Sequence, residues 1–232
     1  MKSALPPSPP SKTPEVAYTP PEDAGLAIVH LDEHLLVVDK PAGLLTVPGR
    51  GEGRADCLVS RVQRRYPDAL VVHRLDMATS GLVVLARGAT MQRRLSALFQ
   101  GREVEKVYTA IVHGLIEPDE GQVDLPLITD WPRRPMQMVC HRQGKAALTH
   151  FKVLARDAQQ GWTRVALAPV TGRSHQLRVH MLALGHPIVG DPLYGDRAVQ
   201  QAHPRLMLHA SRLMLPHPGT GQWLSTDSAV PF

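Results

Sequence analysis

After residue 25 the chain alternates short apolar runs with turn residues, a pattern that predicts strands. The first two runs, 26–31 and 35–40, flank the turn-forming residues Asp32-Glu33-His34 and therefore predict a hairpin. Two more runs, 70–76 and 80–87, flank a turn of small residues and predict buried strands. Further strands are predicted at 107–114, 136–140, 147–156, 163–170 and 206–215.

Three segments carry apolar residues at helical spacing, namely 57–66, 90–100 and 174–185. Asp56 and Ser174 suit the N-terminal caps of the first and third of these helices, and Gly185 suits the end of the third. The predicted strands follow one another in groups rather than alternating with helices. The pattern therefore predicts an α+β fold, with a mixed, mostly antiparallel central sheet and flanking helices and loops.

The first 25 residues differ in composition from the rest of the chain. They hold seven of the 21 prolines, which is typical of extended, solvated chain. We therefore predict a Pro-rich flexible tail at 1–25 and a single domain at 26–232. The full length of 232 residues is sufficient for a hydrophobic core.

The sequence favours a cytoplasmic protein that does not associate with membranes. No apolar run approaches the length of a membrane span, and the Pro-rich start lacks the apolar segment of a secretory signal. Cys57 and Cys140 fit no CxxC spacing, so neither a disulfide framework nor a cysteine zinc site is predicted.

Basic residues outnumber acidic residues by 26 to 21, which gives a net charge of +5. Most of the basic residues are Arg, whose planar guanidinium binds phosphates and stacks on bases. Two interpretations are open: a nucleic-acid-binding protein, or the ordinary composition of a proteome that prefers Arg.

The first candidate for chemistry is Asp76, which follows a predicted strand and precedes the turn residues Thr79-Ser80-Gly81. This position presents a carboxylate at the edge of a sheet, with Arg74 on the same side by strand alternation. The alternative interpretation is a turn aspartate that bonds only its own backbone.

The second candidate is the segment 170–180, where Thr171-Gly172 turns sharply into a predicted helix. Arg173 then lies at the positive end of that helix, where a carboxylate or phosphate partner is expected, and Asp76 would serve. His175 and Arg178 are three residues apart and share a helix face that can follow a phosphate backbone. The alternative is a surface helix with ordinary solvated charges.

The third candidate is the pair Lys106 and Tyr108, which point the same way on a predicted strand. Tyrosine can stack on a base or pass a proton through its hydroxyl, although a half-buried structural tyrosine is the alternative. The twelve histidines form no HExxH, HxH or Cys/His cluster, and no Walker or GxGxxG loop is present. No metal site is therefore predicted.

Four segments, in order, resemble the motifs of the RluA family of RNA pseudouridine synthases. They are DKPAGLLTVPGRG (39–51), HRLDMATSGLVVLA (73–86), EKVYTA (105–110) and TGRSHQLRVHMLALGHPIVGDPLYG (171–195). Together they extend over most of the chain after Leu26, and four motifs in one order are far more specific than one. DLPLITDWPRRP (124–135) and the lack of room for an S4-type domain make the chain most similar to the short RluA subgroup.

The resemblance implies a pseudouridine synthase fold and the isomerisation of uridine to pseudouridine in structured RNA. The expected targets are a uridine of the tRNA anticodon loop, a hairpin-loop uridine of large-subunit rRNA, or both. Asp76 is expected to react as nucleophile or as base, Arg173 to hold and neutralise it, and Tyr108 to stack on the uracil and help remove the C5 proton. The residues expected to bind substrate are Arg74, which fills the space of the flipped base, and Lys106, His175, Leu177 and Arg178.

The same resemblance implies no cofactor and no metal ion, because the isomerisation needs neither a redox partner nor an energy source. The expected partner is RNA, and a monomer is the default expectation for the oligomeric state. Seven other arginines are candidates for the phosphate path: Arg61, Arg64, Arg65, Arg93, Arg94, Arg133 and Arg134.

Three other functions stay open from the sequence. One is an RNA-binding or chaperone protein with the same fold and no turnover, and another is a family member with a different RNA target. The third, a metal-dependent hydrolase that uses the histidines, predicts activity that a chelator abolishes.

Overall fold

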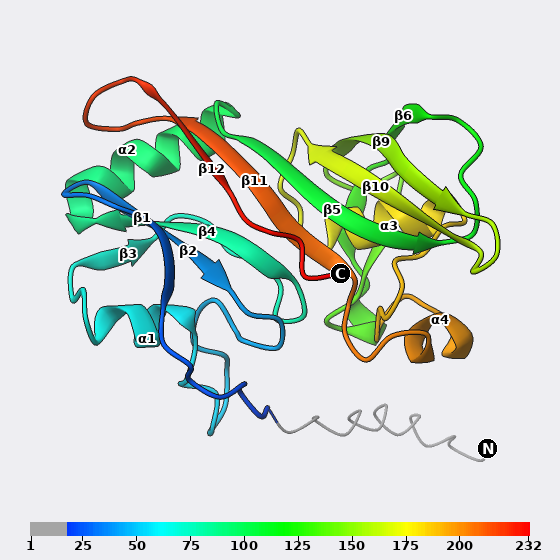
Figure 1. The fold of residues 1–232 in the computed structure, drawn as a ribbon, viewed down its shortest axis with the longest axis horizontal. Coiled ribbons are helices and arrows are strands. Elements are labelled where there is room, and N and C mark those ends of the chain that lie inside the picture. The colour runs from blue at the N-terminus through cyan, green and yellow to red at the C-terminus, as the bar shows by residue number, and fades with distance from the viewer. Residues whose placement is uncertain (1–17) are drawn as a thin grey trace, which may run out of the picture.

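One ten-stranded sheet extends through the computed structural model, which describes residues 18–232 (Figure 1). The order along the sheet is β1-β2-β4-β11-β5-β10-β9-β6, with β3 also paired to β4 and β12 to β11, while β7 and β8 form a separate hairpin. The strands are β1 (Ala27–Leu31), β2 (Leu35–Lys40), β3 (Ala69–Val71), β4 (Ser80–Arg87), β5 (Glu105–His113), β6 (Glu120–Asp124), β7 (Leu127–Thr129), β8 (Gln137–Val139), β9 (Leu148–Asp157), β10 (Trp162–Pro169), β11 (Leu208–Pro216) and β12 (Trp223–Asp227).

Helices are few and lie beside the sheet (Figure 1). They are α1 (Leu58–Gln63), α2 (Gly88–Gly101), α3 (Gln176–Ala183), α4 (Arg197–Gln201) and the 3-10 turn η1 (Trp131–Arg133). No helix in the described part of the chain is long and apolar enough to cross a membrane. The predicted α+β class, with a mixed and mostly antiparallel central sheet, is confirmed.

The parallel pairing in the sheet lies between β4 and β11, where Ser80 pairs with His209 and Gly81 with Ala210. Gly81 has φ +112°, and a Cβ at this position would lie 2.4 Å from the backbone oxygen of Ala210. Only glycine allows this close approach of two backbones. The contact fixes the start of β4, directly after the loop that carries Asp76.

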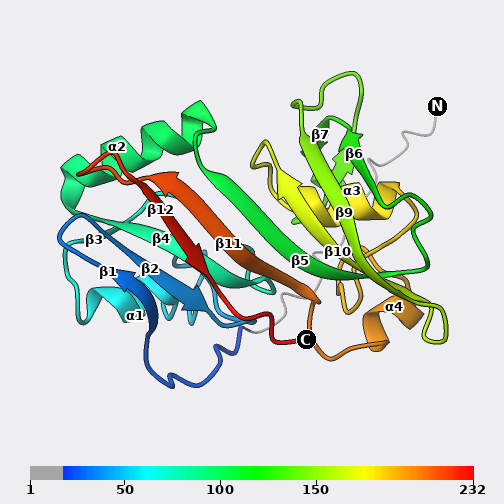
Figure 2. The same ribbon diagram turned by 45° about the horizontal axis from the view of Figure 1, so that its top comes forward.

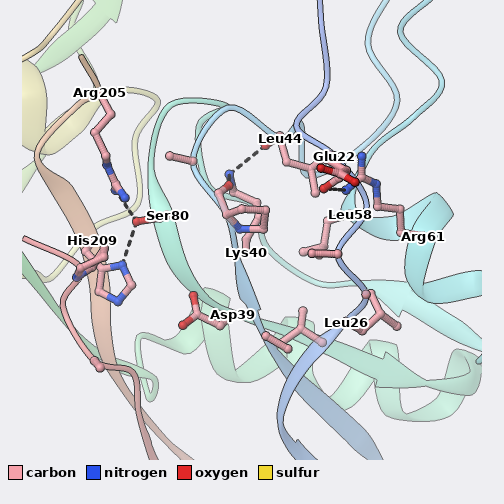
Figure 3. A pocket seen from close by; sticks show the side chains of 18 residues that line it. Glu22, Leu26, Asp39, Lys40, Leu44, Leu58, Arg61, Ser80, Arg205 and His209 are labelled. Carbon is pink, nitrogen blue, oxygen red and sulfur yellow. Dashed lines mark hydrogen bonds between the residues drawn. The ribbon is translucent and has the colours of Figure 1, made fainter.

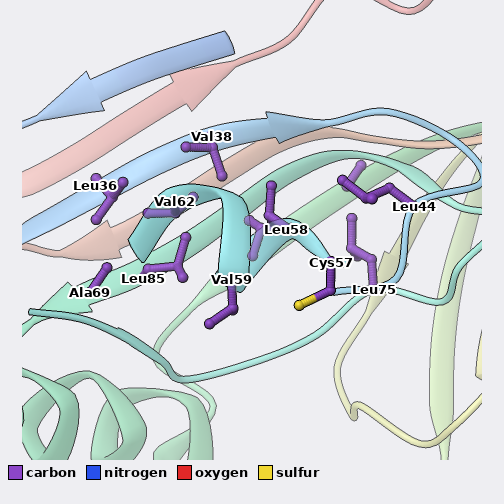
Figure 4. Packing of buried hydrophobic residues seen from close by; sticks show 12 residues of the cluster. Leu36, Val38, Leu44, Cys57, Leu58, Val59, Val62, Ala69, Leu75 and Leu85 are labelled. Atoms are coloured by element: carbon purple, nitrogen blue, oxygen red, sulfur yellow. The ribbon is translucent and has the colours of Figure 1, made fainter. Parts of the chain in front are cut away.

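Both faces of the sheet are covered where β2 and β4 lie. Leu36 and Val38 pack with Leu58 and Val62 of α1 in one cluster, which Figure 4 shows. Their neighbours in β2, Leu35 and Val37, point to the other face, where they pack with Leu95 of α2. Because successive side chains of a strand alternate between faces, β2 has to be apolar at consecutive positions.

The second half of the sheet has its own core. Val165 and Leu167 of β10 pack with Leu177 and Met181 of α3, and β12 runs beside β11 along the middle of the molecule (Figure 2). Tyr108 of β5 contacts the clusters of both halves. This tyrosine therefore marks the junction between them.

The predicted hairpin of β1 and β2 is confirmed, and so are the strands predicted from residue 107 onward. The strand predicted over 70–76 is wrong in its second half, because β3 ends at Val71. The His73 ring stacks on Phe99 at 4.5 Å and its Nε2 accepts the N–H of Val84, which takes the following residues away from the sheet. Arg74 and Asp76 therefore lie in a loop, and strand alternation does not orient them.

Two predicted helix caps differ from the structure. The N-cap of α1 is Cys57 rather than Asp56, whose carboxylate instead binds Arg61 through two hydrogen bonds of 2.8 and 2.7 Å. The N-cap of α3 is His175 rather than Ser174, because Gln176 Oε1 already accepts the backbone N–H of Arg173 in this turn.

The predicted tail is described in its last eight residues, whereas residues 1–17 lie outside the described part. The Tyr18 hydroxyl donates to the carbonyl of Asp56 and accepts the N–H of Leu45. Arg61, which is buried, donates to the carbonyls of Pro21 and Glu22. Residues 18–25 are therefore attached to α1 and the loop before it.

Candidate active site

Asp76 lies half-buried in the loop between β3 and β4, at the wall of a pocket that Tyr108 and α3 also line. Thr46 holds this loop from the side, because its hydroxyl donates to the carbonyl of Leu75 and accepts the N–H of Leu75. The N–H of Thr79 bonds the carbonyl of Asp76 in the turn that follows. The carboxylate is thus carried by a short loop that is fixed on both sides.

Lys40 also holds the loop of Asp76 in place. Its buried ammonium donates to three carbonyls, those of Pro41 at 3.0 Å, Leu44 at 2.8 Å and Met77 at 3.2 Å. Burial lowers the pKa of Lys40 to about 7, and the charge of Asp76 opposes that shift. Lys40 was not identified as a site residue from the sequence, although it stands in the first of the four motifs.

A chain of hydrogen bonds fixes the first residue of β4. Arg205 donates to Ser80 Oγ at 2.6 Å, and Ser80 Oγ lies 2.8 Å from His209 Nδ1. His209 Nε2 bonds Ser228, which in turn bonds Asp39. Figure 3 shows Arg205, Ser80 and His209 together at one side of a second pocket, which Lys40 also lines.

The basic partner of Asp76 is Arg178 of α3. Its Nη1 lies 3.5 Å from Asp76 Oδ2, while its Nε and Nη2 bind Asp191 at 2.8 and 2.6 Å. Burial opposes the charge of Arg178, but the hydrogen bonds and charge of Asp191, together with the charge of Asp76, outweigh burial and raise the pKa of Arg178. A fixed guanidinium thus lies beside the carboxylate of Asp76.

Arg173, the partner expected from the sequence, does not take this place. Its side chain is exposed, and its Nε donates to the carbonyl of Ala146 at 3.0 Å. The helix begins three residues later than Arg173, so Arg173 belongs to the preceding turn while Arg178 faces Asp76. Both arginines line the pocket, and the structure pairs Asp76 with Arg178.

The other expected residues are divided between the pocket and its surroundings. Arg74, Tyr108, His175 and Leu177 line the pocket, whereas Lys106 is not among the lining residues. Burial is the main cause that raises the pKa of Tyr108, and Asp76 adds to it, so the hydroxyl keeps its proton at neutral pH. The pocket thus combines one carboxylate, a protonated phenol and a guanidinium.

His175 has two polar neighbours in this pocket. Its Nε2 lies 3.8 Å from Asp76 Oδ2, and its Nδ1 lies 2.7 Å from the hydroxyl of Tyr194. The same hydroxyl accepts the backbone N–H of Gln137, the first residue of β8. Tyr194 was not singled out from the sequence.

The connection between β7 and β8 carries an exposed aromatic group. Trp131 is 65% exposed, and the guanidinium of Arg134 stacks on its ring at 3.6 Å. Of the arginines considered for the phosphate path, Arg61 is buried and bound to Asp56, so it is not free to bind RNA. Arg134 and Trp131 form instead a flat, exposed pair.

One group of side chains in the described residues has the spacing of a metal site: His30, Asp32 and His217. His217 Nδ1 accepts the backbone N–H groups of Gly219 and Thr220, so the proton of the neutral ring is on Nε2. That Nε2–H donates to Asp32 at 2.9 Å. A ring with this tautomer has no free lone pair for a metal, so this group is a hydrogen-bonded cluster.

Comparisons with known proteins show what the chain is similar to. The sequence model of the family described as RNA pseudouridylate synthase matches residues 34–183. The chain is 50% identical over 215 residues to the dual-specificity RNA pseudouridine synthase RluA of Escherichia coli (strain K12), covering 93% of this chain and 98% of that protein. It is 49% identical over 217 residues to the protein of the same name from Pasteurella multocida (strain Pm70), covering 94% and 99%.

The fold is also similar to a solved human structure. The human RNA pseudouridylate synthase domain containing 1 superimposes with a TM-score of 0.76 and 30% sequence identity, covering 92% of this chain and 87% of the human one. The matched family region contains Asp76, Tyr108 and Arg178.

Proposed function

Because the chain belongs to the RNA pseudouridylate synthase family and is therefore an isomerase that acts on RNA, we propose that Asp76 is its reactive carboxylate. The observation that carries the proposal is the pocket itself, where Asp76 faces Arg178 at 3.5 Å beside the half-buried Tyr108. A carboxylate needs such a partner to stay ionised when the substrate displaces water.

The reaction rearranges bonds without a change in composition. The C1′–N1 bond of uridine breaks, the uracil turns while it stays bound, and a C1′–C5 bond forms. Finally C5 loses its proton and N1 gains one. Asp76 acts on the sugar, either as a nucleophile at C1′ or as the base that removes a sugar proton. Arg178 serves both routes, because each starts from the ionised carboxylate.

Tyr108 provides the flat surface on which the uracil turns. Its ring contacts the cores of both halves of the sheet, so it is held rigidly. Because the raised pKa keeps its hydroxyl protonated, Tyr108 contributes by stacking and as a relay, which takes the C5 proton while it passes its own proton to water, rather than as a phenolate base.

The target base has to leave its stack before it reaches Asp76, at a cost of a few kcal/mol that is smallest in an unpaired loop. Arg74 is exposed at the mouth of the pocket and suits the space that the base vacates. Trp131 and Arg134 on the β7–β8 hairpin offer a second surface for an unpaired base.

The relatives named above are dual-specificity enzymes, and we extend that property to this chain. The proposed substrates are a uridine of the tRNA anticodon loop and a hairpin-loop uridine of large-subunit rRNA. The enzyme acts in the cytoplasm as a monomer, without a metal ion or a cofactor, and residues 26–232 carry the catalytic groups.

The experiment is to map pseudouridine by mass spectrometry and primer extension in unmodified tRNA and rRNA-hairpin transcripts, incubated with the enzyme in EDTA. Conversion at one loop uridine in each transcript supports the proposal. Conversion of only one transcript contradicts the dual specificity and leaves that RNA as the substrate. Activity that EDTA abolishes contradicts the metal-free mechanism. A folded protein that binds both transcripts and converts neither would support the RNA-binding alternative.

A further inference from the structure

His175 has a backbone conformation that L-residues rarely adopt. Its φ is +53°, and in the described residues Arg102 is the other non-glycine residue with positive φ. The left-handed conformation costs about 1–2 kcal/mol for such a residue. Strain of this kind persists where surrounding contacts hold the residue, and it is concentrated at functional sites. Here the strain directs the ring between Tyr194 and Asp76.

Tyr194 has two hydrogen-bonding neighbours at its hydroxyl. One lone pair of the hydroxyl accepts the N–H of Gln137 at 2.8 Å, which leaves the hydroxyl proton free to be donated to His175 Nδ1, 2.7 Å away. Burial raises the pKa of Tyr194 to about 12, so this proton is present at neutral pH. Burial also lowers the pKa of His175, against the opposing attraction of Asp76, so the imidazole is neutral.

A neutral imidazole that accepts a hydrogen bond at Nδ1 carries its proton on Nε2. That Nε2 points to Asp76 Oδ2 at 3.8 Å. The separation is longer than a hydrogen bond, as is common for catalytic contacts that tighten when the substrate binds. Arg178 approaches the same oxygen at 3.5 Å.

We propose that Tyr194 is a positioning residue, which holds His175 in the Nε2–H tautomer so that this N–H acts with Arg178 to orient the carboxylate of Asp76. The inference rests on the proposed reactive role of Asp76. It adds a function for two residues that the reaction itself does not require. The Nδ1–H tautomer would instead turn a lone pair toward the carboxylate and repel it.

Several other charged and titratable groups lie around His175 and Asp76. The effect of the Tyr194 hydroxyl has to be distinguished from theirs. Arg178 comes from α3, Asp191 and Tyr194 from the segment after it, Arg74 from the loop of Asp76, and Lys40 from the end of β2. Tyr108 faces Asp76 from β5. Apart from Tyr194 itself, none of these groups is altered when only the hydroxyl of Tyr194 is removed.

The direct test is the protonation of the His175 ring, measured by long-range ¹H–¹⁵N NMR of the full-length protein labelled in histidine. We expect an unprotonated Nδ1 and a protonated Nε2 at pH 7.5 in the wild type, and a mixture of tautomers in Tyr194→Phe. A wild-type ring protonated on Nδ1 would overturn the inference. This readout does not depend on catalytic activity.

The kinetic test compares Tyr194→Phe with Tyr18→Phe, which removes a hydroxyl that also bonds two backbone groups but does not line the pocket. For Tyr194→Phe we expect kcat to fall about tenfold, KM for RNA to stay within twofold, and the acidic limb of the pH profile of kcat/KM to move toward neutral pH. Tyr18→Phe should leave kcat and the pH profile unchanged. Equal effects of the two substitutions would overturn the inference.

A second variant tests whether Tyr194 acts through His175. Asparagine tolerates the left-handed conformation but is too short to reach Asp76, so His175→Asn should lose kcat to a similar extent without a change of backbone. Adding Tyr194→Phe to His175→Asn should then cost less than twofold, whereas a full tenfold further loss would overturn the inference. Wild-type activity in Asp76→Asn would instead refute the proposed function, with the NMR result unaffected.

Discussion

At the scale of single residues, two arginines lie near the carboxylate of Asp76, and only one of them faces it. Arg178 has three donors in use, two on Asp191 and one toward Asp76, while Arg173 bonds a carbonyl at the surface. The sequence placed both arginines near one helix start, but it did not reveal where that start lies. When the helix starts at 176 rather than 174, a different arginine faces Asp76, and the spacing of residues in the sequence does not determine that start.

The first prediction compares the two arginines by conservative substitution. Arg178→Lys keeps the charge but lacks the planar fork that binds Asp191 and reaches Asp76 together, so we expect single-turnover rates about 100-fold lower. Arg173→Lys is the matched control and should stay within about threefold of the wild type. A larger loss in Arg173→Lys than in Arg178→Lys would contradict the pairing seen in the structure.

The second prediction concerns His73. Its ring stacks on Phe99 and its Nε2 accepts the N–H of Val84, and burial lowers its pKa to about 3. The unfolded chain titrates near 6.5, so below that pH it binds a proton that the folded state excludes. The stability from this residue is therefore complete above about pH 6.5 and is lost as the pH falls toward 3, by about 2 kcal/mol at pH 5.

Urea unfolding at pH 7.5 and pH 5 measures this effect against His73→Gln, whose carbonyl can still accept the N–H of Val84. His175, His180 and His209 have lowered pKa values as well and remain in both proteins, so they cancel in the comparison. We expect a smaller loss of stability at pH 5 in His73→Gln. An equal loss in both proteins would show that His73 does not contribute.

At the scale of elements, the apolar pattern predicted most strands because their faces are buried. It predicted β2 and β4 well, since both of their faces are covered and their sequences are continuously apolar. It missed β6, β7 and β12, which are short or largely exposed, so no burial imposes a pattern on them. The end of β3 was missed because the ring of His73, rather than a backbone carbonyl of β3, accepts the N–H of Val84.

The third prediction tests the hairpin of β7 and β8. Base stacking on an aromatic side chain contributes about 1–3 kcal/mol, so Trp131→Ala should raise KM for RNA about tenfold and leave kcat unchanged. Trp223 of β12 is the matched control, since it is 62% exposed against 65% for Trp131. If Trp223→Ala weakens RNA binding as much as Trp131→Ala, the hairpin is not a specific contact surface.

The fourth prediction tests the segment before β1. A protein that begins at Leu26 loses the carbonyl partners of buried Arg61 and the two hydrogen bonds of Tyr18. We expect it to unfold at a lower urea concentration, with a free energy of unfolding lower by about 1–3 kcal/mol. We expect it to retain kcat, because no residue that lines the Asp76 pocket is removed. Unchanged stability would show that the attachment of residues 18–25 contributes nothing.

At the scale of the whole molecule, the sheet brings together residues that are distant in the sequence. Asp76 comes from the loop before β4, Tyr108 from β5 and Arg178 from α3, and β11 lies between β4 and β5 in the sheet. The order of the motifs in the sequence identified the segments that form the site, but it did not predict which side chains contact one another. The pairing of Asp76 with Arg178, and of His175 with Tyr194, required the packing of α3 against the sheet.

The central claim is that Asp76 performs the reaction in a pocket that is otherwise built to bind RNA. The most direct measurement is the single-turnover rate of pseudouridine formation in a tRNA anticodon stem-loop by Asp76→Asn, together with the affinity of this variant for the same RNA. We expect Asp76→Asn to lose at least 10³-fold in rate, with an affinity within about threefold of the wild type. A variant that binds the RNA and converts it within tenfold of the wild-type rate would contradict the reactive role of Asp76.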